Sequence, residues 1–389
     1  MSTTANDRRA LGARAPGGHL FLGIAFLIAV LNLLGLVMVM SASSVLAHDT
    51  HGSSWYYVSR QALWMAVGAL ALLLTARVDY HRWRRTASPL LAVSVLALGA
   101  VLVPGIGLEA NGARRWLGTD GVTVQPSELV KLTMLVWIAD LLARRSRNVR
   151  NVRATLRPVL VVLVTAGTLI MLEPDLGTTI VISAIAVSLC FVAGVPIPQM
   201  ARWGAVGFGV VMTLSVIAPY RRARVFTFLD PWSDPLDNGW QHIQSLVGLA
   251  EGGIAGTGLG ASRAKWGFLP FAHTDFIFAI IGEELGLVGA FAVVSLFVLL
   301  GVLGIRTALH APDRFGMLLA VGITAWFLVQ SFVNIGVAIG VLPVAGVPLP
   351  FVSFGGSSLV VAMAGSGLLL AVARQAAPSA AVPKDAAPP

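Results

Sequence analysis

Long apolar runs alternate with short polar segments along almost the whole chain. The first run, from Leu20 to Met40, contains Asn32 as its only strongly polar residue. A helix of about 20 such residues crosses the hydrocarbon core of a bilayer, which is ~30 Å thick. A cleavable signal peptide has a shorter apolar core, of about 7–15 residues, and many further runs follow here. The pattern therefore predicts an integral membrane protein.

Ten apolar segments predict an all-α fold with about ten transmembrane helices. They cover residues 20–45, 55–76, 87–104, 126–143, 157–172, 176–194, 203–219, 275–305, 315–341 and 353–373. An even number of crossings places both termini on one side of the membrane. The two ends, 1–18 and 376–389, are rich in Ala, Pro and Ser and are expected to be disordered tails around a membrane domain over 19–375.

The basic residues orient the chain. Lys and Arg are retained on the cytoplasmic side, and most of the 27 lie in alternate connections, densest between Arg144 and Arg157. Both termini are therefore expected in the cytoplasm. The net charge of +9 has this origin, so it does not indicate nucleic-acid binding. The single Cys190 excludes an internal disulfide and a cysteine metal cluster.

Two extracytoplasmic connections, about 105–130 and about 220–274, hold most of the other basic residues. The second is far longer than an ordinary connection, and its many Trp, Leu and Phe residues argue against disorder. Within it, residues 240–250 place apolar side chains close to helical spacing. This spacing predicts a helix that lies at the outer membrane surface.

Ionisable side chains at membrane depth are costly, so each is a candidate functional group. Glu128 and Lys131 can face each other three residues apart on one helix. Asp175 lies at the turn between two spans, and His273 and Asp275 lie where the long connection enters the eighth span. These groups suit a substrate with pyrophosphate and hydroxyl groups, because basic side chains bind phosphate and a carboxylate accepts a hydroxyl proton.

Structural alternatives compete with these roles. Glu128 and Lys131 can form a buried structural ion pair, and Asp175 can cap the helix that follows it. A lone histidine such as His273 is more often structural than metal-binding. Asp275 has a helix cap as its main alternative role.

Two carboxylates follow about two helical turns, ~12 Å, after Asp275. Helical spacing places Glu283 toward the side of Asp275 and Glu284 on the opposite side. Both could instead serve helix packing. Substrate binding by Glu283 and packing by either residue therefore remain open alternatives.

Two further stretches are expected to have irregular backbone. Residues 341–357 contain three prolines and the pair Gly355-Gly356, which preclude a regular helix. Residues 111–118 form a turn-rich element that carries Arg115 and Trp116. That pair could bind substrate or could anchor the chain at the membrane interface.

Several motifs occur in a characteristic order. They are residues 40–44 (MSASS), 111–116 (NGARRW), 125–132 (QPSELVKL), 173–178 (EPDLGT), 273–279 (HTDFIFA), 282–286 (GEELG) and 349–358 (LPFVSFGGSS). Together, over residues 20 to 373, they resemble the SEDS family (shape, elongation, division and sporulation), which polymerises peptidoglycan glycan strands from lipid II. Residues 258–284 are more similar to the division branch, FtsW, than to the elongation branch, RodA. Phe271 departs from the pattern, since a glutamate is common there, which puts a two-acid mechanism in doubt.

The resemblance implies an inverting glycosyl transfer with Asp275 as the catalytic base. The 4-hydroxyl of an acceptor GlcNAc attacks lipid-pyrophosphate-linked MurNAc and releases undecaprenyl pyrophosphate. A divalent cation, Mg²⁺ or Mn²⁺, is expected to assist, without an organic cofactor. The candidate substrate-binding residues are Arg115, Trp116, Glu128, Lys131, Asp175, His273, Glu283, Gly355, Gly356 and Ser357.

The resemblance also implies partners and a location. The expected substrates are lipid II and a growing lipid-linked glycan strand, and the expected partners are a class B penicillin-binding protein and division-complex proteins. The site would face outward from the cytoplasmic membrane at the division septum. The alternatives are a lipid II flippase or other transporter, an elongation-type polymerase, and a non-catalytic scaffold. The outward clustering of polar groups and the lack of an evident internal repeat argue against a transporter.

Overall fold

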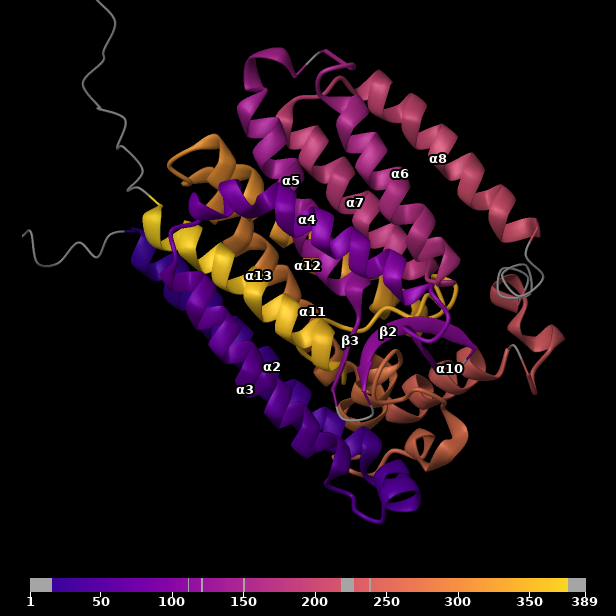
Figure 1. Cartoon of the computed structure of the whole chain (residues 1–389). Helices are drawn as coiled ribbons and strands as arrows, with labels where there is room; N and C mark the ends of the chain where they lie inside the picture. Colours follow the sequence, from indigo (N-terminus) through magenta and orange to yellow (C-terminus); the bar gives the residue numbers. More distant parts are fainter. Residues whose placement is uncertain are drawn as a thin grey trace, which may run out of the picture.

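The computed structural model describes residues 16–110, 112–119, 122–149, 151–217, 227–237 and 239–376. Its helices pack side by side in one bundle (Figure 1). The main helices are α2 (Pro16–His51), α3 (Tyr56–Arg77), α4 (Arg82–Val101), α5 (Pro126–Arg144), α6 (Leu156–Leu172), α7 (Leu176–Ala193), α8 (Ile197–Ile217), α10 (Trp240–Gly252), α11 (Ile277–Leu309), α12 (Arg314–Ala338) and α13 (Gly356–Gln375). The expected tails lie almost wholly outside the described residues.

Seven of the described helices are long and apolar enough to cross a membrane: α2 from Gly18, α3, α4, α7, α11, α12 and α13. Helix α6 is apolar but shorter, and α5 carries several ionisable residues. Large apolar side chains such as Phe26, Leu96 and Phe291 stay exposed on the bundle, as suits a surface that faces lipid. The chain is a multi-span helical membrane protein, as expected, whereas the total of ten crossings stays a prediction.

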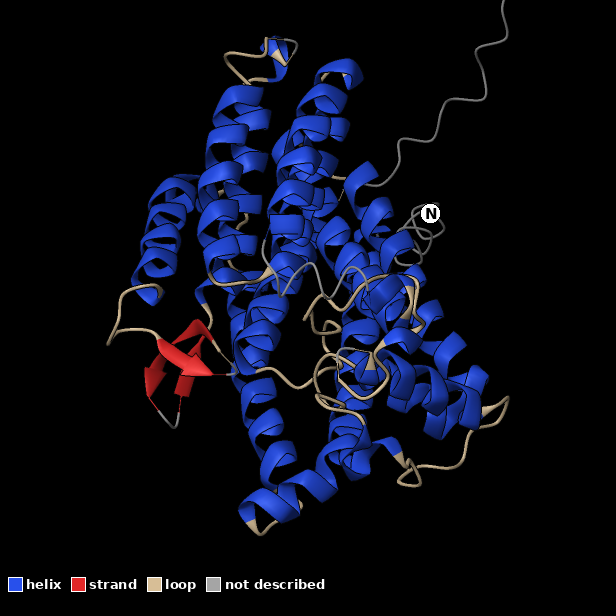
Figure 2. Ribbon diagram, turned by 90° about the vertical axis from the view of Figure 1, so that its right-hand side faces the viewer, coloured by secondary structure: helices blue, strands red, loops and turns tan. Residues whose placement is uncertain are grey.

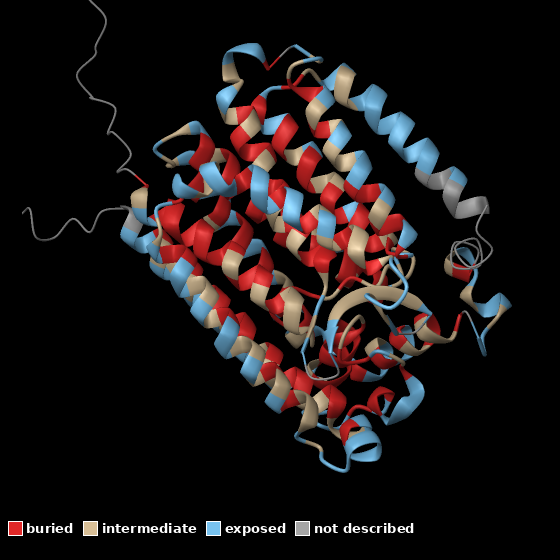
Figure 3. Ribbon diagram, in the orientation of Figure 1, coloured by how far each residue is buried: buried red, intermediate tan, exposed pale blue. Residues whose placement is uncertain are grey.

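A small sheet and several long loops lie at one end of the bundle, which we call the loop end. It holds a small sheet, α10, the segment 253–276 that leads into α11 (the entry segment), and the segment 339–355 between α12 and α13 (the α12–α13 segment) (Figures 1 and 2). The connections after α3, α5 and α11 lie at the opposite end. Buried residues run along the bundle axis and continue into the loop end (Figure 3).

The sheet is an addition to the expected all-helical fold. Strands β1 (Leu108–Ala110), β2 (Ala113–Thr119) and β3 (Val122–Val124) pair antiparallel in that order. The prediction that 111–118 is only turn-rich is wrong, because β2 occupies most of it. Gly112 supplies the turn between β1 and β2 with a φ of 72°, which favours glycine. Asn111 lies outside the described residues.

Helix α11 is not continuous. It begins at Ile277 and is interrupted at Gly286, which has φ 66° and ψ −166°. The entry segment fills the gap, since Thr257 N donates to Glu283 O at 2.9 Å and Leu287 N donates to Gly253 O at 2.9 Å. A Cβ on Gly286 would lie 2.4 Å from Ile254 O, so only glycine permits this approach.

Candidate functional site

Residues 273–275 form a turn just before α11, and hydrogen bonds fix its backbone. Each of their three carbonyl oxygens accepts a hydrogen bond from α12 or the α12–α13 segment. The bonds are Phe354 N to His273 O (2.9 Å), Ser353 Oγ to Thr274 O (2.6 Å) and Asn334 Nδ2 to Asp275 O (2.8 Å). The turn that carries the candidate base is therefore fixed by its main chain.

The Asp275 side chain is partly exposed and lies beside the α12–α13 segment. A Cβ on Gly346 would lie 3.9 Å from Asp275 Oδ2, and Gly346 has a φ of 66°. Helix α11 begins at Ile277, two residues after the start read from the sequence. Asp275 belongs to the turn closed by Phe271 O, which accepts from Asp275 N at 3.1 Å.

His273 packs into an aromatic cluster. Its ring lies 4.7 Å from the Tyr57 ring and 5.6 Å from the Phe354 ring, measured between centroids. Burial lowers the pKa of His273 to about 4, so the ring is neutral at neutral pH. This packing fits the structural alternative for His273, and substrate binding by His273 stays a prediction.

Glu128 and Lys131 form the expected ion pair on α5, with 2.8 Å between Lys131 Nζ and Glu128 Oε1. Their side chains are 2% and 1% exposed, so both charges are removed from solvent. Lys131 Nζ also donates to Gln330 Oε1 of α12 at 3.0 Å. Glu128 Oε2 has no hydrogen-bond partner within the described parts of the chain.

Asp175 caps α7. Its Oδ1 accepts from Thr178 N at 2.9 Å, and its Oδ2 accepts from Thr178 Oγ1 at 2.8 Å. Gly177, the second residue of α7, leaves no room for a Cβ, which would lie 2.3 Å from Ala345 O. The α7 end that carries Asp175 therefore abuts the α12–α13 segment, which also borders Asp275.

Arg115 ties β2 to the turn between α6 and α7. Its Nε donates to Glu173 O at 2.8 Å and its Nη2 donates to Pro174 O at 2.7 Å. The neighbouring Trp116 is partly exposed on the same strand. Glu173 is buried, and neither of its carboxyl oxygens is hydrogen-bonded in the described structure. Burial and the adjacent Asp175 raise the pKa of Glu173 to about 8.

Glu283 and Glu284 hold the entry segment. Glu283 accepts from Ser262 Oγ (2.6 Å) and Arg263 N (2.5 Å), and Glu284 accepts from Ser41 Oγ (2.6 Å) and Ser262 N (3.3 Å). Ser262 contacts both carboxylates, through its hydroxyl and its N–H, while Glu284 also reaches Ser41 of α2 and Glu283 faces Gly248 of α10. Their packing role is supported.

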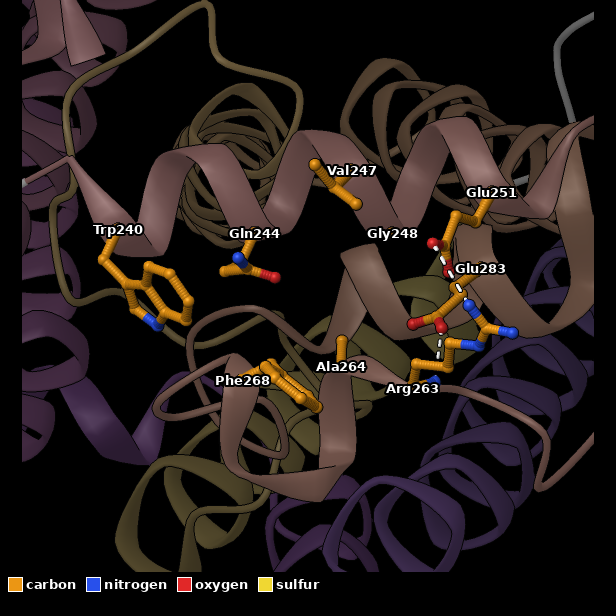
Figure 4. A pocket seen from close by; sticks show the side chains of 9 residues that line it. All are labelled: Trp240, Gln244, Val247, Gly248, Glu251, Arg263, Ala264, Phe268 and Glu283. Carbon is orange, nitrogen blue, oxygen red and sulfur yellow. Dashed lines mark hydrogen bonds and ion pairs between the residues drawn. The ribbon is translucent and has the colours of Figure 1, made fainter. Parts of the chain in front are cut away.

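A cavity of about 250 Å³ lies between α10, the entry segment and the start of α11 (Figure 4). Its lining comprises Trp240, Gln244, Val247, Gly248, Glu251, Arg263, Ala264, Phe268 and Glu283. Helix α10 confirms the helix expected over 240–250. The cavity borders Glu283, whose carboxylate is nevertheless engaged by the entry segment.

The glycine and serine candidates at the start of α13 support the framework. Ser357 Oγ donates to Thr123 O and accepts from Gln125 N, each at 3.1 Å, and so joins α13 to the sheet. A Cβ on Gly356 would lie 2.6 Å from the Trp64 ring, which explains glycine there. Gly355 N approaches Gln61 Oε1 at 3.4 Å.

Metal ligands are not gathered in the described part of the chain, where no three His, Cys, Asp or Glu side chains form a group suited to a metal ion. Mg²⁺ is often held by one or two carboxylates together with substrate phosphates, so assistance by a divalent cation stays a prediction.

Known proteins resemble this chain over nearly its full length. The profile of the family described as "Cell cycle protein" (FtsW/RodA/SpoVE) matches residues 22–377. Stage V sporulation protein E of Bacillus subtilis is 41% identical over 341 residues, which cover 88% of this chain and 93% of that protein. The chain belongs to the SEDS family. The probable peptidoglycan glycosyltransferase FtsW of Mycobacterium tuberculosis is 42% identical, over 94% of this chain and 69% of that protein.

Solved structures share the fold of this SEDS chain. One, described as "Structural coordination of polymerization and crosslinking by a peptidoglycan synthase complex", has a TM-score of 0.75 and 32% identity, over 91% of this chain and 97% of that chain. The rod shape determining protein RodA of Thermus thermophilus has a TM-score of 0.67 and 29% identity, over 90% of this chain and 96% of that chain. The SEDS resemblance inferred from the motifs is therefore confirmed.

Within the SEDS chain, the α12–α13 segment borders Asp275, contacts the end of α7 that Asp175 caps, and is linked to Lys131 through Gln330 of α12. Arg115 borders the turn between α6 and α7, which also contains Asp175, and Trp116 follows it on β2. Sequence reasoning missed Gln330 and Asn334, which are polar residues four apart in an apolar run. Applying the criterion of polar residues at membrane depth to amides as well as to charges would have found them.

Proposed function

We propose that this chain is a peptidoglycan glycosyltransferase that polymerises glycan strands from lipid II. The observation that carries the proposal is that one irregular segment at the loop end borders Asp275, contacts the end of α7 that Asp175 caps, and is linked to Lys131 through Gln330. Relatives named peptidoglycan glycosyltransferase, at 38–42% identity, support the class of enzyme.

Asp275 acts as the general base in this proposal. Its carboxylate accepts the proton of the acceptor 4-hydroxyl while that oxygen forms a bond to the anomeric carbon of the donor MurNAc. The bond from that carbon to the pyrophosphate oxygen breaks, the anomeric centre inverts, and undecaprenyl pyrophosphate leaves. The partial exposure of Asp275 suits a group that must reach a substrate.

Positive charge near the leaving pyrophosphate would stabilise the transition state. Arg115 is half-buried beside the turn at 173–174, where it could extend toward a substrate. Lys131 is buried and paired, so in the described conformation it acts through its neighbours rather than by direct contact. We therefore assign Lys131 a supporting role, in which it holds neighbouring residues of the site in place as long as no substrate displaces them.

The loop end is the extracytoplasmic end in this proposal, because the basic clusters lie at the other end. A cross-linking partner of the class B penicillin-binding type and a role at the division septum belong to the same proposal. They are supported by a similar chain found in a complex described as coordinating polymerization and crosslinking, and by the relatives named FtsW.

The test is Asp275→Asn in purified protein, reconstituted with its partner and lipid II. Removing the base should lower polymer formation about 100-fold or more. Asp49→Asn, an exposed carboxyl at the end of α2, is the matched control and should polymerise normally. Undiminished polymerisation by Asp275→Asn would overturn the base assignment. Translocation of labelled lipid II with no polymer from the wild-type protein would favour the flippase instead.

A further inference from the structure

We propose that Gln330 and Asn334 of α12 are positioning residues. They fix the position of the turn at residues 273–275 relative to Lys131. The proposal rests on the function proposed above and adds two residues to it. Both side chains are buried, at 1% exposure, and neither is charged. They lie four residues apart, so they project from one face of the helix on successive turns.

Asn334 contacts the Asp275 turn directly. Its Nδ2 donates to Asp275 O and to Val347 O, each at 2.8 Å, which uses both of its amide hydrogens. One side chain therefore joins the residue that carries the base to the α12–α13 segment. Asn334 Oδ1 has no partner among the described residues.

Gln330 makes the corresponding connection to Lys131. Its Oε1 accepts from Lys131 Nζ at 3.0 Å and from Trp326 Nε1 at 2.7 Å, and its Nε2 donates to Pro348 O at 2.8 Å. The carboxamide has a fixed orientation, because the donors on Lys131 and Trp326 require an oxygen where they meet and Pro348 O requires the nitrogen.

The two amides bind consecutive carbonyls of the α12–α13 segment, Val347 O and Pro348 O. A displacement of Lys131 or of α12 would therefore act on the same short stretch of backbone that borders Asp275. A general base must lie within hydrogen-bond reach of the proton that it accepts, and a misplacement of about 1 Å can lower a rate ~100-fold. The position of the turn at residues 273–275 should therefore affect the rate of catalysis.

A purely structural role is the competing explanation, since buried amides commonly join helices in membranes. Here, however, both amides donate to irregular backbone rather than to a second helix, and one of them reaches Asp275 itself. Ser331, on the same helix, offers a matched comparison. It is buried, and its hydroxyl donates to Phe327 O within the helix at 2.7 Å.

The experiment compares Asn334→Asp, Gln330→Met and Ser331→Ala in the reconstituted lipid II assay. Asn334→Asp keeps the shape but places an oxygen against two carbonyls, so kcat should fall about 10- to 100-fold while KM for lipid II changes less than about 3-fold. Gln330→Met should lower kcat several-fold. The pH profile of kcat should shift for Asn334→Asp and not for Ser331→Ala.

A second measurement does not depend on activity. Amide hydrogen–deuterium exchange at residues 274–276 should rise in Asn334→Asp and stay at the wild-type level in Ser331→Ala. Unchanged exchange and unchanged kcat in Asn334→Asp would overturn the proposal, as would equal losses in Ser331→Ala. If Asn334→Asp is not recovered folded, a wild-type kcat for Gln330→Met would overturn it. Absence of polymer from the wild-type protein would instead count against the proposed function, and the exchange result would still decide the positioning.

Discussion

Several carboxylates at the two ends of the bundle differ in how they are paired. At the opposite end, Asp140 accepts from Arg84 Nε at 2.8 Å and lies 2.5 Å from Arg144 Nη2. Asp313 there accepts from the Tyr80 hydroxyl and lies 2.8 Å from His81 Nε2. Both oxygens of each carboxylate are engaged, those of Asp140 by arginine side chains and those of Asp313 by side chains and backbone N–H groups.

At the loop end, by contrast, described groups retain unused hydrogen-bonding capacity. Glu128 Oε2, both carboxyl oxygens of Glu173 and Asn334 Oδ1 are buried without a partner. Buried polar atoms are normally satisfied by protein or water. The comparison indicates that Asp140 and Asp313 at the opposite end are paired within the protein, whereas Glu128 and Glu173 at the loop end keep carboxyl oxygens available for water or substrate.

The largest expected effect tests the charged pair of the loop end. Lys131→Met leaves Glu128 buried without its partner, which should cost about 3–5 kcal/mol of stability and abolish polymerisation. The double variant Lys131→Met with Glu128→Gln should recover folding, measured by thermal unfolding in detergent, but not polymerisation. Recovery of both properties would show that the pair is only structural.

The opposite end should respond in stability alone. Asp313→Ala removes the cap of α12, in which Asp313 Oδ1 accepts from Phe315 N at 2.7 Å, and leaves the Tyr80 hydroxyl unpaired. Loss of a cap costs about 1 kcal/mol, and a stranded buried hydroxyl costs about 1–3 kcal/mol. The Tm should fall while kcat per folded molecule stays within about 2-fold. A large drop in kcat would contradict the contrast between the two ends.

The smallest effect concerns Glu173. Its pKa is raised from 4.5 to about 8, chiefly by burial and then by Asp175. Below pH 4.5 both folded and unfolded chains hold the proton; above it the unfolded chain ionises first, so wild-type stability falls as pH rises toward about 8. Glu173→Gln, neutral throughout, should match the wild-type Tm near pH 4.5 and exceed it by about 2 °C or more at pH 8. A lower Tm at pH 8 would indicate a charged, stabilising Glu173.

Local sequence patterns predicted the features that depend on residues close together in the chain. Apolar runs located the long helices, three-residue spacing paired Glu128 with Lys131, and the spacing in 240–250 located α10. The strands at 108–124 are short and lack a clear apolar alternation, so the sequence did not distinguish them from turns. The partners of Asn334 are backbone carbonyls, one of them on Asp275 far back in the chain, and a spacing rule cannot reveal such contacts.

The carbonyl bonds around residues 273–275 have a consequence for tolerance to change. A peptide oxygen is present whatever the side chain, so exchanging Thr274 or Val347 for a residue of similar size preserves these attachments. The donors are different, because a two-hydrogen amide of the right length exists only in asparagine and glutamine. Substitutions should therefore be tolerated at positions that contribute only a carbonyl oxygen and restricted at Asn334, which supplies the amide.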